Sequence, residues 1–243
     1  MPDNPISTVF FDLDETLLQH TGSPRDLVFE IHAAHADAFD GIDAKTFSQT
    51  LWRKAHDMWH MMFDGVLPGT VARAYMFKNT LRELNADTDL AAVMIEEFEV
   101  GMLANTRPYP GAEDVLTALN DAGITTGIIT NGYTHMQRRK IEHHNLHERV
   151  QHIFVSEAVG AHKPDHRIFM TALSKTNSQA DQAMHVGDHL INDIQGALDA
   201  GMHAAYYNPS EEDVDHPEGA QRIRRLTQVL ELVGLEEPSP ATK

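Results

Sequence analysis

From residue 112 onward, short apolar runs alternate with segments of helical periodicity, and this alternation constrains the fold more than any other feature. Apolar runs of four to eight residues are typical of buried strands, and apolar residues three or four apart are typical of helices. Strands that alternate with helices form parallel sheets, because a parallel pair needs a crossover connection. We therefore predict an α/β core with a doubly wound parallel sheet. Its predicted strands are residues 124–130, 152–155, 184–187 and 203–207, and its predicted helices are residues 112–122, 134–144, 165–174, 191–200 and 223–233.

The region before this alternation has a different pattern. An apolar run at residues 9–11 predicts a first buried strand. Helical periodicity then continues to residue 103 without a strand-like run, over residues 25–38, 44–63, 70–84 and 90–103. The predicted domains are a core of residues 1–17 and 105–235, an inserted all-helical cap of residues 18–104, and a flexible tail of residues 236–243, which is polar and rich in proline.

The composition narrows the classes of function. The 36 acidic residues outnumber the 19 basic ones and give a net charge of −17, which disfavours binding to a nucleic-acid polymer. The net charge does not exclude a small phosphorylated metabolite as the substrate, because a local cation can override the net field of the protein. The absence of cysteine excludes disulfides and thiol chemistry. We expect no membrane segment, no signal peptide and a cytoplasmic location. The sequence leaves the oligomeric state open.

Two aspartates, Asp12 and Asp14, directly follow the first predicted strand. Ligands of open α/β sheets bind at the carboxyl ends of the strands, so both carboxylates are expected at such a site. Two ionised carboxylates this close repel each other, and a divalent cation with oxygen ligands, such as Mg²⁺, would relieve the repulsion. An ordinary turn with an aspartate cap is the structural alternative.

Later strand ends carry further polar residues. If the site holds Mg²⁺ and a phosphate ester, Asp12 is the candidate nucleophile and Asp14 the candidate acid and base. In the segment Thr130-Asn131-Gly132, Thr130 and Asn131 are expected to donate hydrogen bonds to the phosphate, and Lys163 is expected to supply a positive charge. The remaining candidates are Asp188, as a metal ligand, and Asp193, as its support.

Each of these residues also has an ordinary structural explanation. Asn-Gly is common in turns, a lysine before a proline is usually solvated, and an aspartate at a strand end often caps the next helix. Asp193 alone is most often a residue that complements a helix dipole. The occurrence of all of them in order, each near a strand end, favours the functional interpretation.

The four motifs resemble those of the haloacid dehalogenase superfamily in its phosphatase branch. They are Asp12-Leu13-Asp14-Glu15-Thr16, Ile129-Thr130-Asn131-Gly132, Lys163-Pro164, and Gly187-Asp188 followed by Asp193. The resemblance implies a Rossmann-like core with a helical cap, Asp12 as nucleophile, Asp14 as acid and base, and Thr130, Asn131 and Lys163 as phosphate binders. It implies that Mg²⁺ is held by the Asp12 side chain, the Asp14 backbone carbonyl and Asp188. His189 departs from the family, which usually has a small hydroxyl residue or asparagine there, so a supporting hydrogen bond is in question.

Within this superfamily several activities compete. The dehalogenase branch uses no metal and no second aspartate, so Asp14 argues against it. Phosphonate cleavage needs a cap lysine just after the first strand, and Lys45 comes too late in the sequence. A phosphomutase shares the core and stays open. A catalytically inactive metal-binding scaffold, suggested by the 16 histidines, is disfavoured by the complete catalytic set.

The substrate is expected to be selected by the cap. The segments 128–134 and 193–197 resemble the pyrimidine 5′-nucleotidase-like members, so nucleoside 5′-monophosphates are the hypothesis, with phosphoglycolate or a sugar phosphate as the rival. Aromatic residues at helical spacing are more often core than base-stacking surfaces. The aromatic candidates in the cap are Trp52, Trp59, Phe63, Tyr75 and Phe77.

Overall fold

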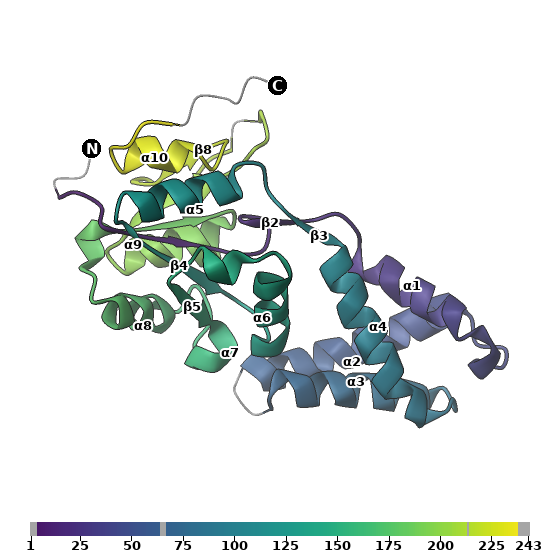
Figure 1. Ribbon diagram of the computed structural model, residues 1–243. Coiled ribbons are helices and arrows are strands. Elements are labelled where there is room, and N and C mark those ends of the chain that lie inside the picture. The colour runs from purple at the N-terminus through teal and green to yellow at the C-terminus, as the bar shows by residue number, and fades with distance from the viewer. Residues whose placement is uncertain (1–3, 64–66, 213, 238–243) are drawn as a thin grey trace, which may run out of the picture. The chain divides into compact units, whose positions relative to one another are not determined.

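The computed structural model describes residues 4–63, 67–212 and 214–237, and within the helix α2 (Ala44–Phe63) it does not describe the side chains of residues 59, 60, 62 and 63. The chain divides into two compact units, drawn in Figure 1. The first contains residues 1–19, 108–132 and 141–243, and the second contains residues 20–107 and 133–140. No helix in the described ranges combines the length and the apolar character needed to cross a bilayer.

The first unit is built on a six-stranded parallel sheet with the order β5-β4-β1-β6-β7-β8. The central strand β1 pairs with β4 on one side and β6 on the other, so that Phe11 lies level with Ile128 and Val186. The predicted parallel α/β fold is confirmed. The strands are β1 (Thr8–Phe11), β4 (Thr125–Thr130), β5 (His152–Val155), β6 (Ala183–Gly187), β7 (His203–Tyr207) and β8 (Gln221–Ile223).

Each face of this sheet has its own apolar core, because successive side chains of a strand point to opposite faces. Val9 and Phe11 of β1 pack on one face with α5 and α10, and Phe10 packs on the other face with α8. The helical elements are α5 (Ala112–Asp121), α6 (Thr134–His143), η3 (Leu146–Glu148), α7 (Ser156–Val159), α8 (His166–Thr176), η4 (Ala180–Gln182), η5 (Leu190–Gln195), α9 (Gly196–Asp199) and α10 (Gln228–Leu232).

The strand order places a binding site beside β1. Starting from β1, the chain first builds the sheet outward through β4 and β5, and then returns to the other side of β1 with β6. Such a reversal opens a crevice at the carboxyl ends of the two strands where it occurs. Asp12 follows β1 and Asp188 follows β6, so both carboxylates lie at this point.

The second unit is a helical bundle in which α1 and α3 each pack against both α2 and α4. Its apolar core includes Val28, Phe47, Phe77 and Met94, all of them inaccessible to solvent. Its elements are α1 (Pro24–Ala34), η1 (Ala36–Ala38), α2 (Ala44–Phe63), α3 (Gly69–Glu83), η2 (Thr88–Leu90) and α4 (Ala91–Ala104).

Several details differ from the predictions. The last predicted helix, residues 223–233, is shorter in the structure, where α10 spans Gln228–Leu232, and the strand β8 (Gln221–Ile223) just before it was not predicted. Two short strands, β2 (Leu18–His20) and β3 (Thr106–Pro108), pair with each other and were not predicted. The helical unit also includes residues 133–140, which belonged to the predicted core.

The aromatic residues of the helical unit differ in exposure. Phe77 is fully buried and belongs to the core, whereas the Tyr75 side chain is 51% exposed. Trp52 is half-buried. The side chains of Trp59 and Phe63 lie outside the described part of the structure. Of the predicted tail, Glu237 accepts a hydrogen bond from Arg225 at 3.1 Å, and residues 238–243 lie outside the described ranges.

Candidate active site

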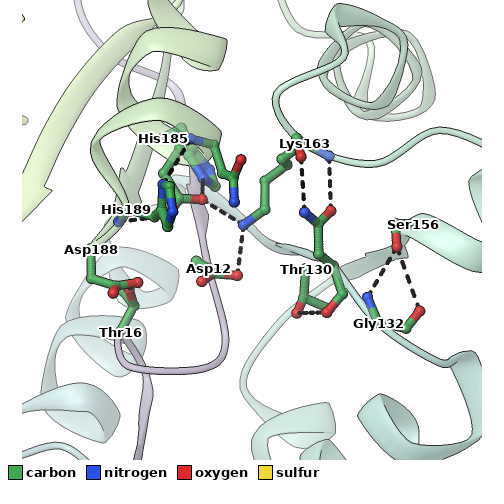
Figure 2. Close-up of polar contacts among 12 residues, drawn as sticks. Asp12, Thr16, Thr130, Gly132, Ser156, Lys163, His185, Asp188 and His189 are labelled. Carbon is green, nitrogen blue, oxygen red and sulfur yellow. Dashed lines mark hydrogen bonds and ion pairs between the residues drawn. The ribbon is translucent and has the colours of Figure 1, made fainter. Parts of the chain in front are cut away.

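The ammonium group of Lys163 links two carboxylates at the carboxyl edge of the sheet. Its Nζ donates hydrogen bonds to Asp12 Oδ1 at 2.7 Å and to Asp193 Oδ1 at 2.5 Å. Figure 2 shows the Lys163 side chain reaching toward Asp12 from the loop before α8. All three side chains are almost completely shielded from solvent. Three predicted site residues far apart in sequence are therefore in contact.

Asp188 adds a third carboxylate to this group. One carboxylate oxygen each of Asp12, Asp188 and Asp193 lies within 4.8 Å of the other two. Three carboxylates next to a single ammonium leave an excess of negative charge, and hard divalent cations prefer such oxygen ligands. Asp193 already accepts hydrogen bonds from three donors, which are Lys163 Nζ, His185 Nε2 and His189 N. Asp12 and Asp188 are therefore the side chains suited to hold Mg²⁺.

The pKa values reflect this excess of charge. Burial raises the pKa of Asp12 to about 8, because Lys163 offsets only part of the desolvation and Asp193 adds repulsion. Burial and the charge of Asp193 likewise raise the pKa of Asp188 to about 6. The opposite holds for Asp193, where Lys163 and His185 outweigh burial and keep the pKa below its usual range. A cation beside Asp12 and Asp188 would favour their ionised forms.

Asn131 holds the backbone of Lys163 in place. Its Nδ2 donates to Lys163 O at 2.9 Å, and Lys163 N donates back to its Oδ1 at 2.8 Å. This paired contact fixes the base of the lysine side chain beside Asp12. The structure therefore places Asn131 as a support for Lys163, in addition to its predicted contact with phosphate.

The neighbours of Asn131 lie at the end of β4. The Thr130 side chain is fully buried there. Ser156, the first residue of α7, accepts a hydrogen bond at its Oγ from Gly132 N at 3.0 Å. The loop after β4 is thereby tied to the element that follows β5.

Asp14 lies in a tight loop rather than in the cluster of three carboxylates. The loop is closed by hydrogen bonds from Leu18 N to Leu13 O at 2.8 Å and from Glu15 N to Leu18 O at 2.6 Å. Glu15 has a φ of 60°, a left-handed conformation that is uncommon outside glycine. Its carboxylate accepts a hydrogen bond from the Tyr109 hydroxyl at 3.0 Å, which stabilises this conformation.

The His189 side chain caps the turn that follows β6. Its Nδ1 accepts hydrogen bonds from Ile191 N at 3.2 Å and Asn192 N at 3.1 Å, at the start of the π-helical turn η5. Its own backbone N donates to Asp193 Oδ2 at 3.0 Å. The imidazole thus satisfies the first amides of the turn, as an asparagine or serine cap would.

Gly187 leaves the space that Asp193 occupies. A Cβ atom at residue 187 would lie 2.3 Å from Asp193 Cγ and 2.6 Å from its Oδ2. These distances are far below van der Waals contact, so the carboxylate and a side chain at residue 187 exclude each other. The glycine at this position is explained by this close approach.

The substitution Gly187→Ala is therefore expected to displace Asp193 and with it Lys163. Hydrolysis of p-nitrophenyl phosphate should fall by about 10-fold or more, because mispositioning of a catalytic group by 1 Å can cost about 100-fold. Gly123→Ala is the control for a destabilising glycine substitution away from this site: nothing lies within 4 Å of a Cβ atom there, but its φ of 75° strains alanine, so the thermal midpoint should fall while turnover is kept. Unchanged turnover in Gly187→Ala would contradict the steric argument.

Sequence reasoning missed His185, which contacts this site. Its Nε2 lies 3.0 Å from Asp193 Oδ1. The signal was present, because His185 is the one polar residue of the strand segment Ala183-Met184-His185-Val186-Gly187. A histidine inside an otherwise apolar, fully buried strand needs a polar partner.

The chain is similar in sequence or in fold to several known proteins. The glyceraldehyde 3-phosphate phosphatase of Pyrococcus furiosus is 29% identical over 241 residues, covering 96% of this chain and 95% of its own. The pyrimidine 5′-nucleotidase YjjG of Escherichia coli is 28% identical, covering 92% and 95%. The crystal structure of a 2-haloacid dehalogenase from Pseudomonas syringae superposes with a TM-score of 0.73 at 27% identity, covering 94% and 98%.

A family model for haloacid dehalogenase-like hydrolases matches residues 6–201, a range that includes β1, the helical unit and the whole carboxylate cluster. The match covers most of the chain and agrees with the resemblance carried by the four motifs. This protein belongs to the haloacid dehalogenase-like hydrolase family.

Proposed function

We propose that this enzyme is a Mg²⁺-dependent phosphomonoester hydrolase that acts through an aspartyl-phosphate on Asp12. The observation that carries the proposal is the contact of Asp12 with Lys163 beside Asp188, at the carboxyl end of β1. A carboxylate nucleophile, a fixed ammonium group and a cation site then lie next to one another. The phosphatase and nucleotidase names of the two relatives support a phosphate ester as the substrate.

In the first step, an Asp12 oxygen attacks phosphorus while the bond from phosphorus to the leaving oxygen breaks. Asp14 gives its proton to the leaving oxygen. In the second step, water attacks the same phosphorus, Asp14 takes a proton from the water, and phosphate leaves with Asp12 restored. Lys163, supported by Asp193 and Asn131, stabilises charge on the phosphoryl oxygens, with hydrogen bonds from Thr130 and Asn131.

Bound Mg²⁺ would supply positive charge that favours the ionised form of Asp12 and binds phosphate oxygen. The side chains of Asp12 and Asp188 and the backbone carbonyl of Asp14 would hold it. Asp193 supports the site through Lys163 rather than as a ligand, because three donors already occupy its oxygens.

The dehalogenase alternative fits the site less well, despite the name of the structural neighbour. A dehalogenase of this superfamily needs neither a second aspartate nor a metal, and this chain has both Asp14 and the cluster with Asp188. Phosphonate cleavage is disfavoured because Lys45 is exposed in the first turn of α2. A phosphomutase is distinguished by its product.

Residues 18–104 are proposed to act as a cap that selects the leaving group, because a lid that closes over an active site excludes water and contacts the rest of the substrate. Nucleoside 5′-monophosphates are the proposed substrates, on the resemblance of the segments 128–134 and 193–197 and on the similarity to YjjG. A small sugar phosphate or phosphoglycolate is the second candidate, which the similarity to the Pyrococcus furiosus enzyme favours.

A panel of phosphate esters tests both the reaction and the substrate. We expect release of inorganic phosphate in the presence of Mg²⁺ and loss of turnover after chelation with EDTA, restored by excess Mg²⁺. Nucleoside 5′-monophosphates should show a higher kcat/KM than phosphoglycolate or glyceraldehyde 3-phosphate. Equal or reversed preference would defeat the nucleotide proposal, and transfer of phosphate without its release would identify a mutase.

A further inference from the structure

His185 is a buried polar residue for which the proposed mechanism gives no role. It lies in the middle of β6, its side chain is 0% exposed, and its ring makes an edge-on contact with Phe169, with 5.4 Å between the ring centroids. A polar ring in such surroundings costs free energy unless it is hydrogen-bonded. The bond to Asp193 Oδ1 at 3.0 Å therefore accounts for its presence in this core.

The geometry defines the protonation state of His185. A carboxylate oxygen can only accept, so Nε2 carries the hydrogen that is donated to Asp193. Burial outweighs the neighbouring carboxylate and lowers the pKa of His185, so the ring is neutral and Nδ1 carries no hydrogen. Nδ1 has no hydrogen-bond partner among the described residues. An apolar residue would avoid this unpaired nitrogen, so the donor at Nε2 must offer a benefit.

The benefit concerns the orientation of Asp193. Three donors from different parts of the chain converge on its carboxylate: Lys163 Nζ and His185 Nε2 on Oδ1, and His189 N on Oδ2. Gly187 forms the surface against which this carboxylate packs. The position of Oδ1 in turn sets where the ammonium group lies between Asp193 and Asp12. Among the residues that the structure describes, His185 is the one side chain besides Lys163 that is bonded to that oxygen.

We propose that His185 is a positioning residue, which orients the Asp193 carboxylate so that Lys163 Nζ stays beside Asp12 and the phosphate. This inference rests on the proposed function, because it assigns His185 a part in the same site. His185 touches neither the substrate nor Asp12. It acts through Asp193 and Lys163.

A purely structural role makes the opposite prediction for two substitutions. If His185 only filled the core beside Phe169, methionine would replace it well, since it is apolar and flexible. Glutamine would then be the more harmful change, because it brings a buried amide. If the donor to Asp193 matters, glutamine is the better replacement, because its Nε2 can occupy the position of the histidine Nε2. Asparagine is too short to place a donor there.

The test compares His185→Gln, His185→Asn and His185→Met in the full chain with Mg²⁺. We expect kcat/KM for p-nitrophenyl phosphate to stay within about 3-fold of the wild type in His185→Gln, and to fall by about 10- to 100-fold in the other two, as for the loss of a hydrogen bond to a charged group. The affinity for inorganic phosphate should follow the same order. His203→Met, on the neighbouring strand β7, is the matched control, because its Nε2 contacts only Asp181 O at 3.1 Å in the described structure, and it should not change turnover.

The outcomes separate the two hypotheses. Equal activity in His185→Gln and His185→Met, or higher activity in His185→Met, would overturn the positioning role. The thermal midpoint of each variant shows whether it is folded, and if His185→Met fails to fold, the comparison of glutamine with asparagine still decides. A wild-type chain that hydrolyses no phosphate ester would overturn the proposed function instead, and the order of phosphate affinities would then test the positioning role alone.

Discussion

Replacing Asp12 with asparagine is expected to lower the turnover of p-nitrophenyl phosphate by about four to six orders of magnitude, the range seen when a catalytic nucleophile or base is removed. The amide is nearly the same size as the carboxylate and can still accept a hydrogen bond from Lys163. It cannot form the aspartyl-phosphate. The measurement is the steady-state rate with Mg²⁺, together with the thermal midpoint to show that the variant is folded.

Asp43→Asn provides the matched control for this change. Asp43 Oδ1 accepts a hydrogen bond from Thr46 N at 2.7 Å at the start of α2, and asparagine caps helices about as well as aspartate. Its turnover should equal that of the wild type. Activity that persists in Asp12→Asn at more than about a hundredth of the wild-type rate would contradict nucleophilic catalysis by Asp12.

Replacing Glu99 with glutamine is expected to destabilise the helical unit by about 3 kcal/mol, as for a buried ion pair that loses one partner. Glu99 Oε1 accepts from Arg73 Nη1 at 2.5 Å, and Oε2 accepts from Arg139 Nη1 at 2.6 Å and lies 3.0 Å from His135 Nε2. The side chains of Glu99 and Arg73 are only 6% and 10% exposed. The neutral amide would leave the buried Arg73 charge without its counter-ion.

Tryptophan fluorescence during urea unfolding measures this effect selectively, because both tryptophans of the chain lie in α2. Glu83→Gln is the matched control: Glu83 also contacts two cations, Arg53 and Lys54, but at the surface, where such pairs contribute little. Similar midpoints for Glu99→Gln and the wild type would show that the buried pair does not stabilise the unit.

The same pair predicts a dependence on pH. Burial alone would raise the pKa of Glu99, but Arg73 and the hydrogen bond from Arg139 outweigh it and hold the pKa below its usual value of 4.5. A lowered pKa stabilises the folded state above the ordinary value, and this contribution is lost as the pH falls through the folded-state pKa. The stability advantage of the wild type over Glu99→Gln should therefore shrink as the pH falls from 7 to below 4.5.

The sequence was sufficient to predict the sheet and the meeting of Asp12, Lys163 and Asp188 at its edge, because both leave local signals. The apolar run before Asp12 predicts β1, and parallel strands bring their carboxyl ends to one edge regardless of the loops between them. The contact of Lys163 with Asp12 and Asp193 follows from that topology together with the family motifs. The one motif residue that departs from the family, His189, acts as a cap through its ring nitrogen, which the residue type alone did not reveal.

Features that depend on distant contacts could not be predicted from the sequence. The strand β8 has only three residues and ends at Ile223, where the predicted last helix begins, and its pairing with β7 decides its conformation. His185 and Asp193 are eight residues apart, and they meet because the π-helical turn η5 brings Asp193 back over β6. The grouping of residues 133–140 with the helical unit depends on partners such as Glu96 and Glu99, which are far away in the sequence.

That grouping has a consequence for the exchange of modules between relatives. Tyr133 directly follows the segment Thr130-Asn131-Gly132. The Arg73 guanidinium carbon lies 4.9 Å from the centroid of the Tyr133 ring, and a Cβ atom at Gly69 would lie 1.7 Å from Tyr133 Cδ1. Together with the ion pairs of Arg139, these contacts make residues 133–140 part of the inserted unit. A chimaera that transplants only residues 20–107 would keep the pair of Arg73 and Glu99, but it would leave Glu96 and Glu99 without Arg139 and Arg73 without the Tyr133 ring. A functional graft has to include both segments, so substitutions in the two segments are expected to evolve together.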